Sequence, residues 1–254
     1  MINLTAIYIL WLREMKRFFR AKTRVLGSLL MPFFFLVFLG LGFKNISFPG
    51  LPGGTDYLYF LVPGIIGMNL LMGSMMAEIS VLWDREFGFL KEIMVTPVHR
   101  ISIVLGRIAG GTTTAILRGL IILVISLFLG FRISTISSLF MTLVFMLLIA
   151  FTFIGLGLIF ASRMKDMQGF SLIMNFIIFP LFFLSGAFFP LESMPKWIQY
   201  LSFVDPLTYG VDGMRSVLIQ GSMYSTELNL MILTGFSILM VFLGTYFFQI
   251  SEKV

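Results

Sequence analysis

The chain has 254 residues, of which 58% are hydrophobic and only 12% are charged, and its formal net charge is +6. A soluble domain of this size carries about a quarter charged residues, so the composition excludes a soluble globular protein and indicates an integral membrane protein. Cysteine is absent, which excludes disulfides and thiolate metal sites, and the single histidine cannot form a zinc site alone.

The first 24 residues carry an amphipathic helical pattern. At about 100° per residue, basic side chains gather on one side and apolar side chains gather on the other, with Trp11 at the boundary. The basic side consists of Arg13, Lys16, Arg17, Arg20 and Arg24. This pattern predicts an interfacial helix along the inner leaflet. Anchoring to lipid headgroups and docking of a partner protein are both open for it.

Six apolar runs follow, and each is close to the roughly 20 residues that a helix needs to cross a membrane. They are residues 25–43, 58–82, 103–131, 136–162, 169–189 and 228–250. The runs are continuous and do not alternate every second residue, which favours helices over a β-barrel. Six spans put both termini on one side, and the excess of lysine and arginine on that side places both termini in the cytoplasm.

Residues 83–100 concentrate charge between the second and third spans, so we expect them in water on the cytoplasmic side. Within this stretch Phe87, Leu90, Ile93 and Met94 recur at helical spacing. A threonine and a proline then end the run. The pattern predicts a short amphipathic helix, on which a soluble partner could push.

The third span contains a polar, glycine-rich stretch at residues 106–114. It lacks the lysine of a phosphate-binding loop and lies within a span, so we expect close helix packing there. Arg118 lies deepest in the membrane, about halfway across, and is a candidate to face a polar cavity. Glu78 matches Arg107 in depth, and we expect these two residues to form a pair.

Methionines and phenylalanines form helical stripes in two of the spans. Met72 and Met76 lie in the second span, and Phe179 and Phe183 lie in the fifth. Soft, adaptable side chains suit a variable apolar ligand. Ordinary lipid-facing or packed helices carry similar stripes, and that is the interpretation that periodicity alone favours.

Residues 190–223 are too many for a simple turn and too apolar for a free loop. Pro195 and Pro206 resemble first-turn prolines, and Asp205 precedes the second as a helix cap. We therefore expect two short helices that dip into or lie on the outer leaflet. Asp212 and Arg215, three residues apart, could pair, although keeping the outer cap soluble is the favoured interpretation.

These features together resemble a known family. An amphipathic basic helix precedes six spans, and the motif Glu-x-Gly-x-Leu-x-x-x-x-x-Thr-Pro lies between the second and third. The segments FPLESMPKWIQ and DPLTYGVDGMR lie between the fifth and sixth. The chain is similar over nearly its whole length to the type 2 ABC export permease family, particularly its daunorubicin-resistance and nodulation-factor branch.

The resemblance implies a single transmembrane domain over residues 1–254: an all-α integral membrane protein with six transmembrane helices. It further implies an N-terminal interface helix at residues 1–24, a cytoplasmic coupling helix in the 83–100 loop and short outer re-entrant helices at residues 190–223. Two copies, or this chain and a paralogous permease, would pair. Each would bind a separate ABC ATPase subunit that holds ATP and Mg, which explains the missing phosphate loop; this chain itself would hold no cofactor or metal.

The resemblance also implies residue roles. Coupling to the ATPase falls to Glu86, Gly88, Leu90, Thr96 and Pro97, and the interface helix contributes Arg13, Lys16, Arg17 and Arg20. The substrate path involves Met72, Met76, Phe179 and Phe183, to which Arg118 is added as the deep charge. The outer gate comprises Pro190, Pro195, Pro206, Asp212 and Arg215.

The function implied is that of a permease subunit in an ATP-driven exporter of a hydrophobic or amphipathic substrate: a drug, a lipid or a lipid-linked glycan. The chain would be a multi-pass protein of a prokaryotic plasma membrane without its own ATPase site. An ion-coupled secondary transporter would need midplane carboxylates or inverted repeats, which the sequence does not suggest. A membrane-embedded enzyme would use Asp205 and Asp212, but nothing completes a site around them. A non-transporting scaffold is open.

Overall fold

The computed structural model describes residues 3–43, 56–89, 92, 98–133, 135–219 and 221–251. The regular structure of these residues is helical throughout, and six segments are long and apolar enough to cross a membrane. They are Lys22–Leu41, Tyr57–Glu86, Arg100–Phe128, Ile136–Arg163, Met167–Leu184 and Thr226–Ser251. The prediction of an all-α protein with six spans is confirmed, and each predicted run overlaps one of these segments.

Two of the spans are built from two helical pieces. The first joins α2 (Lys22–Phe34) to the π-helical η1 (Phe35–Leu41), and the second joins α3 (Tyr57–Ala77) to α4 (Ile79–Glu86). The other four are α6 (Arg100–Phe128), α7 (Ile136–Arg163), α8 (Met167–Leu184) and α11 (Thr226–Ser251). Outside the spans lie α1 (Leu4–Arg20), η2 (Leu191–Ser193), α9 (Lys196–Ser202) and α10 (Pro206–Leu218).

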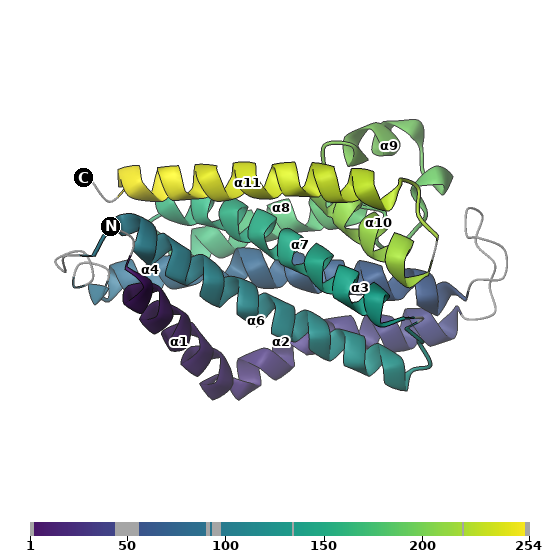
Figure 1. Cartoon of the computed structure of the whole chain (residues 1–254), viewed down its shortest axis with the longest axis horizontal. Helices are drawn as coiled ribbons and strands as arrows, with labels where there is room; N and C mark the ends of the chain where they lie inside the picture. The colour runs from purple at the N-terminus through teal and green to yellow at the C-terminus, as the bar shows by residue number, and fades with distance from the viewer. Residues whose placement is uncertain are drawn as a thin grey trace.

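The helices divide the molecule into two functional ends. Figure 1 shows α1, α4, the start of α6 and the end of α11 at one end of the bundle, and α9 and α10 at the other. With six spans, the chain returns to the end of the bundle at which it started, so α1 and the end of α11 lie at the same end. Positive charge is in excess at the first end, which is the end that the sequence predicted to face the cytoplasm.

The central element is α3, which is apolar on all sides and almost fully buried. A helix of this kind belongs in the interior of a bundle, and α3 contacts α6, α7, α8 and α10. Gly64 allows its close approach to the turn after α8, because a Cβ there would lie 2.2 Å from the Ala187 carbonyl oxygen. The helix α3 therefore joins four other helices of the bundle by direct packing.

The amphipathic helix α1 packs against the third span. A Cβ on Gly106 would lie 2.8 Å from the Leu10 Cβ, and one on Gly110 would lie 2.7 Å from the Glu14 Cβ. Small residues four apart thus let the two backbones come together, which is the packing that the sequence predicted. The Trp11 indole fixes the register further, since its Nε1 donates to Thr113 Oγ1 at 3.1 Å.

Candidate functional site

The end of the second span is built around one buried carboxylate. Asp84, on α4, is 3% exposed and accepts hydrogen bonds from two arginines of different helices. Arg107 Nη2, from α6, lies 2.6 Å from Oδ2, and Arg13, from α1, reaches both carboxylate oxygens with its two terminal nitrogens. Arg17 Nη2 lies 3.5 Å from Asp84 Oδ1. A single side chain therefore joins α1, α4 and α6.

The next residue extends this junction to the other half of the bundle. Arg85 Nη1 donates to the Met164 carbonyl at the end of α7 at 2.9 Å, and its Nη2 donates to Ser251 Oγ on α11 at 3.3 Å. Ser251 Oγ in turn donates to the Ser162 carbonyl at 2.6 Å. We call Asp84, Arg85 and their partners the α4 junction, because two successive residues connect α4 with α1, α6, α7 and α11.

The predicted pair of Glu78 and Arg107 is wrong. Arg107 is bonded to Asp84, and Glu78 Oε2 is buried without a hydrogen-bond partner among the described residues. The long side chain of Arg107 extends toward the polar end of α6, so its guanidinium lies closer to that end than its backbone does. Asp84 lies further along the second span, where α4 continues beyond Glu78, and so receives it.

The coupling motif begins where α4 ends. Glu86 is the last residue of α4 and its side chain is exposed, while Gly88 adopts a φ of 75°. Left-handed backbone at the end of a helix favours glycine, which explains the glycine of the motif by local geometry alone. Leu90, Thr96 and Pro97 lie outside the described residues.

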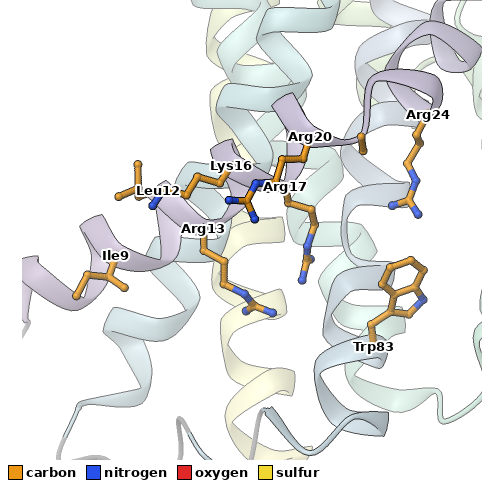
Figure 2. Close-up of a pocket in the computed structure, with 9 residues that line it drawn as sticks. Ile9, Leu12, Arg13, Lys16, Arg17, Arg20, Arg24 and Trp83 are labelled. Atoms are coloured by element: carbon orange, nitrogen blue, oxygen red, sulfur yellow. The ribbon is translucent and has the colours of Figure 1, made fainter.

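The basic side of α1 borders an open groove of about 630 Å³. It is lined by Arg13, Lys16, Arg17 and Arg20 from α1 together with Arg24 and Trp83. Figure 2 shows Arg13, Arg17 and Arg24 projecting from α1 and α2 into the same space as the Trp83 ring. The four arginines and the lysine are thus together, but they do not share one helix as predicted, because α1 ends at Arg20 and Arg24 lies on α2. They do not act alike, because Arg13 and Arg17 turn to Asp84 while Lys16 and Arg20 stay exposed.

A second hollow of about 360 Å³ lies between α1, α2, α3, α4 and α6. Arg118, Met72 and Met76 all line it, so three of the predicted path residues meet at one cavity. Arg118 Nε is buried without a hydrogen-bond partner among the described residues, and the guanidinium lies 5.5 Å from the centre of the Phe18 ring. Gly73 makes room for it, because a Cβ there would lie 3.2 Å from Arg118 Nη1.

The other two predicted path residues lie elsewhere. Phe179 and Phe183, on α8, are 40% and 54% exposed and do not line this cavity. They belong to the outward face of α8, where a span meets lipid or a second protein chain.

The outer prolines occupy three different positions. Pro206 is in the first turn of α10, and Asp205 caps this helix by accepting a hydrogen bond from the Leu207 amide at 2.9 Å, as predicted. Pro195 is itself the cap of α9 and so lies one position before the predicted first turn, and Pro190 precedes η2. Burial raises the pKa of Asp205 to about 8, although the hydrogen bond from the Leu207 amide opposes the shift.

Arg215 holds α10 inside the bundle. Its Nη2 donates to the carbonyls of Gly186 and Ala187, both at 3.0 Å, and to that of Phe60 at 3.2 Å. The guanidinium also packs against the Phe60 ring, 3.5 Å from its centre. One side chain thus connects α10 with α3 and with the turn that follows α8.

Asp212 holds the opposite side of α10 to the start of the last span. It accepts hydrogen bonds from the Met223 amide at 2.8 Å, the Tyr224 amide at 2.9 Å and Asn229 Nδ2 at 2.8 Å. Asp212 and Arg215 are 7% and 6% exposed and bind different partners. The expectation that they keep an outer cap soluble is therefore wrong, and so is the ion pair between them. The physical reason is that α10 penetrates the bundle instead of lying on it.

Comparison with known proteins identifies the fold's family. Residues 5–219 match the sequence profile described as ABC-2 type transporter. The chain belongs to the ABC-2 type transporter family. The relatives described below are named as permeases. This ABC-2 protein is a transmembrane permease subunit of an ABC transporter.

Three relatives illustrate the range. The inner membrane transport permease YadH of Escherichia coli is 29% identical over 246 residues, which cover 95% of this chain and 91% of YadH. The protein of Cyanophora paradoxa named as transport permease ycf38 is 27% identical over 197 residues, covering 77% of this chain and 68% of ycf38. YbhR of Escherichia coli, named a probable multidrug ABC transporter permease, is 27% identical over 166 residues, 65% of this chain and 45% of YbhR.

The α4 junction of this ABC-2 permease was missed by sequence reasoning. Asp84 and Arg85 lie at the start of the charged 83–100 stretch and were counted with its solvent-facing residues. One signal was available. Both directly follow the apolar second span, where a charge is costly unless another helix supplies its partner.

Proposed function

We propose that this permease is the membrane subunit of an ATP-driven exporter, moving a hydrophobic or amphipathic substrate outward by alternating access. Two permease copies pair, and each binds a separate ATPase subunit that holds ATP and Mg. The termini and the 83–100 loop lie in the cytoplasm. The relative YadH is named an inner membrane protein, which supports the same membrane for this chain.

The α4 junction is the observation that carries this proposal. A force applied to the 83–100 loop reaches α4 first, because Glu86 and Gly88 continue directly from it. The hydrogen bonds of Asp84 and Arg85 then oblige α1, α6, α7 and α11 to move with α4. Charged hydrogen bonds in a buried site are expensive to break, so the junction transmits displacement instead of yielding to it.

The outer end supports a gate. Arg215 and Asp212 fasten α10 between α3, the turn after α8 and the start of α11. A Cβ on Gly213 would lie 2.2 Å from the Phe145 ring of α7, so α10 also packs closely there. Opening the outer end requires α10 to leave these partners together, and the closure of the ATPase subunits supplies the free energy.

Ion-driven transport and a scaffold role are the competing functions. Purification of the tagged chain from its native membrane in mild detergent, with mass spectrometry of what accompanies it, separates them. A stoichiometric ATPase with a phosphate-binding loop is the expected result. A chain that purifies alone under conditions that preserve other ABC complexes contradicts the proposal.

Variants of the loop test the coupling assignment itself. Glu86→Ala and Gly88→Leu should leave membrane insertion unchanged and lower the transport obtained per ATP hydrolysed by the reconstituted complex. Gly88→Leu acts by straining a left-handed position, and Glu86→Ala by removing an exposed contact. Normal transport per ATP in both variants would remove the coupling role.

A further inference from the structure

The open groove and the second hollow meet at one place. Arg17, Arg24 and Trp83 line both of them. Cationic side chains predominate among the residues that line the groove, whereas the deeper hollow combines apolar side chains with Arg17, Arg24 and Arg118. The two volumes, about 630 and 360 Å³, together offer a cationic groove that opens to the surface and, behind it, a compartment with both cationic and apolar walls.

Positive charge in this combined site greatly exceeds negative charge. The deeper hollow holds Arg17, Arg24 and Arg118 but only one carboxylate, Glu14, which Arg17 Nη1 already contacts at 3.2 Å. Among the described residues, Arg24 and Arg118 have no carboxylate partner, and Arg24 instead lies over the Trp83 ring, 5.0 Å from its centre. Lys16 and Arg20 add two more cations at the groove, and neither forms an ion pair within the described ranges.

Arg118 decides the sign of the ligand. A guanidinium at membrane depth is costly unless an anion or an acceptor compensates it, and its buried Nε has neither among the described residues. In the part of the chain that the structure describes, the neighbouring Asn69 Oδ1 also has no hydrogen-bond donor. A cationic ligand could bind this oxygen, but it would add to the positive charge that the cavity already holds. Around these polar atoms Met72, Met76 and Val25 offer a surface for an apolar chain.

We propose that the groove and the hollow form one binding site for an amphipath with an anionic, phosphate-type headgroup and an apolar tail. The headgroup binds between Arg24 and Arg118, and the tail lies along the methionines. This inference deepens the proposed function by giving the charge of the substrate. Binding at this site is independent of the proposed function, whereas transport of the bound molecule rests on it. Lipophilic cations are disfavoured at the same site, because the surplus of arginines repels them.

Trp83 reports on binding directly, since it lines both compartments. The chain has three tryptophans, and Trp11→Phe with Trp197→Phe leaves Trp83 as the single fluorophore. This variant is placed in nanodiscs with increasing fractions of phosphatidylglycerol carrying brominated acyl chains, which quench tryptophan on contact. Phosphatidylcholine and a trimethylammonium-propane lipid with the same brominated chains are the zwitterionic and cationic comparisons.

We expect half-maximal quenching by phosphatidylglycerol at about a tenfold lower fraction than by phosphatidylcholine, and the cationic lipid to quench least. Arg118→Met should bring the two curves together, Arg118→Lys should keep them apart, and Arg132→Met, an exposed arginine at the other end of the bundle, should change nothing. Arg24→Gln is a second variant with an exposed side chain, and provides the test if Arg118→Met does not assemble.

Equal quenching by the three headgroups in the starting protein would overturn the inference. So would a preference for phosphatidylglycerol that survives in both Arg118→Met and Arg24→Gln. The assay contains no ATP and no partner subunit, so its failure leaves the proposed function standing. If no ATPase accompanies the purified chain, in contrast, the proposed function is contradicted, while the lipid preference measured by quenching still holds.

Discussion

Replacing Asp84 by asparagine tests the α4 junction with the smallest change of shape. The substitution removes the negative charge and leaves the three arginines in place. Arg107 is the most affected, because its side chain is 4% exposed and loses the only carboxylate that contacts it directly among the described residues. Removing one partner of a buried pair costs about 3–5 kcal/mol. Arg13 and Arg17 are 28% and 29% exposed, so solvent screening reduces their share, and we expect a total near the lower limit.

The measurement follows from the absence of native cysteine. Met15 is buried in α1, so Met15→Cys reports when α1 leaves the bundle. A loss of about 3 kcal/mol corresponds to a roughly hundredfold increase in the open population, and to a similar increase in the rate of maleimide labelling when opening limits access. Asp166→Asn is the matched control, because Asp166 is exposed and asparagine caps a helix as well as aspartate does.

A second variant distinguishes charge from shape. In Asp84→Asn combined with Arg107→Met, the buried arginine that would lose its carboxylate is itself removed, so labelling should fall back toward the original rate. Labelling of Asp84→Asn at the rate of the unchanged protein would show instead that α1 is held in place without the junction.

Three further predictions concern packing and the outer end. Gly110→Val should weaken the docking of α1 by about 1–3 kcal/mol, measured by the same labelling, because its side chain meets the Glu14 Cβ; Gly27→Val, with nothing within 4 Å of its Cβ, should have no effect. Arg215→Met should leave carbonyls of the turn after α8 unpaired and expose a Val211→Cys reporter in the buried part of α10 to labelling; continued protection would remove Arg215 from the outer gate. The raised pKa of Asp205 means that the folded state favours the protonated carboxyl, so its contribution to stability should fall as pH rises from about 4 to about 8; Asp205→Asn should remove this part of the pH dependence of the melting temperature, and an unchanged profile would contradict it.

The sequence predicted the spans well because a helix in lipid must be apolar over its full length. The same holds for local features: the Asp205 cap and the first-turn proline of α10 are read from adjacent residues. Close packing at Gly106 and Gly110 was also predicted, since small residues four apart mark close helix contacts, but the partner helix α1 was not.

What could not be predicted are the partners that come from different spans. Hydropathy fixes the depth of Glu78, Asp84 and Arg107 only coarsely, and the long arginine side chain reaches past its own depth. Arg215 was also misjudged, because its partners are backbone carbonyls, which carry no signal in the sequence. The short helix that begins at Pro206 was expected to lie at the surface, so Arg215 was interpreted as a solvent-exposed charge.

The most direct test of the account follows the outer end while the ATPase subunits close. In the purified complex of the permease with its ATPase, Val211→Cys labelling is compared without nucleotide and after trapping with ATP and vanadate. We predict slow labelling without nucleotide and much faster labelling in the trapped state, and we predict that Asp84→Asn suppresses the increase. Labelling at 211 that does not change on trapping would contradict the claim that closure at the cytoplasmic end moves α10.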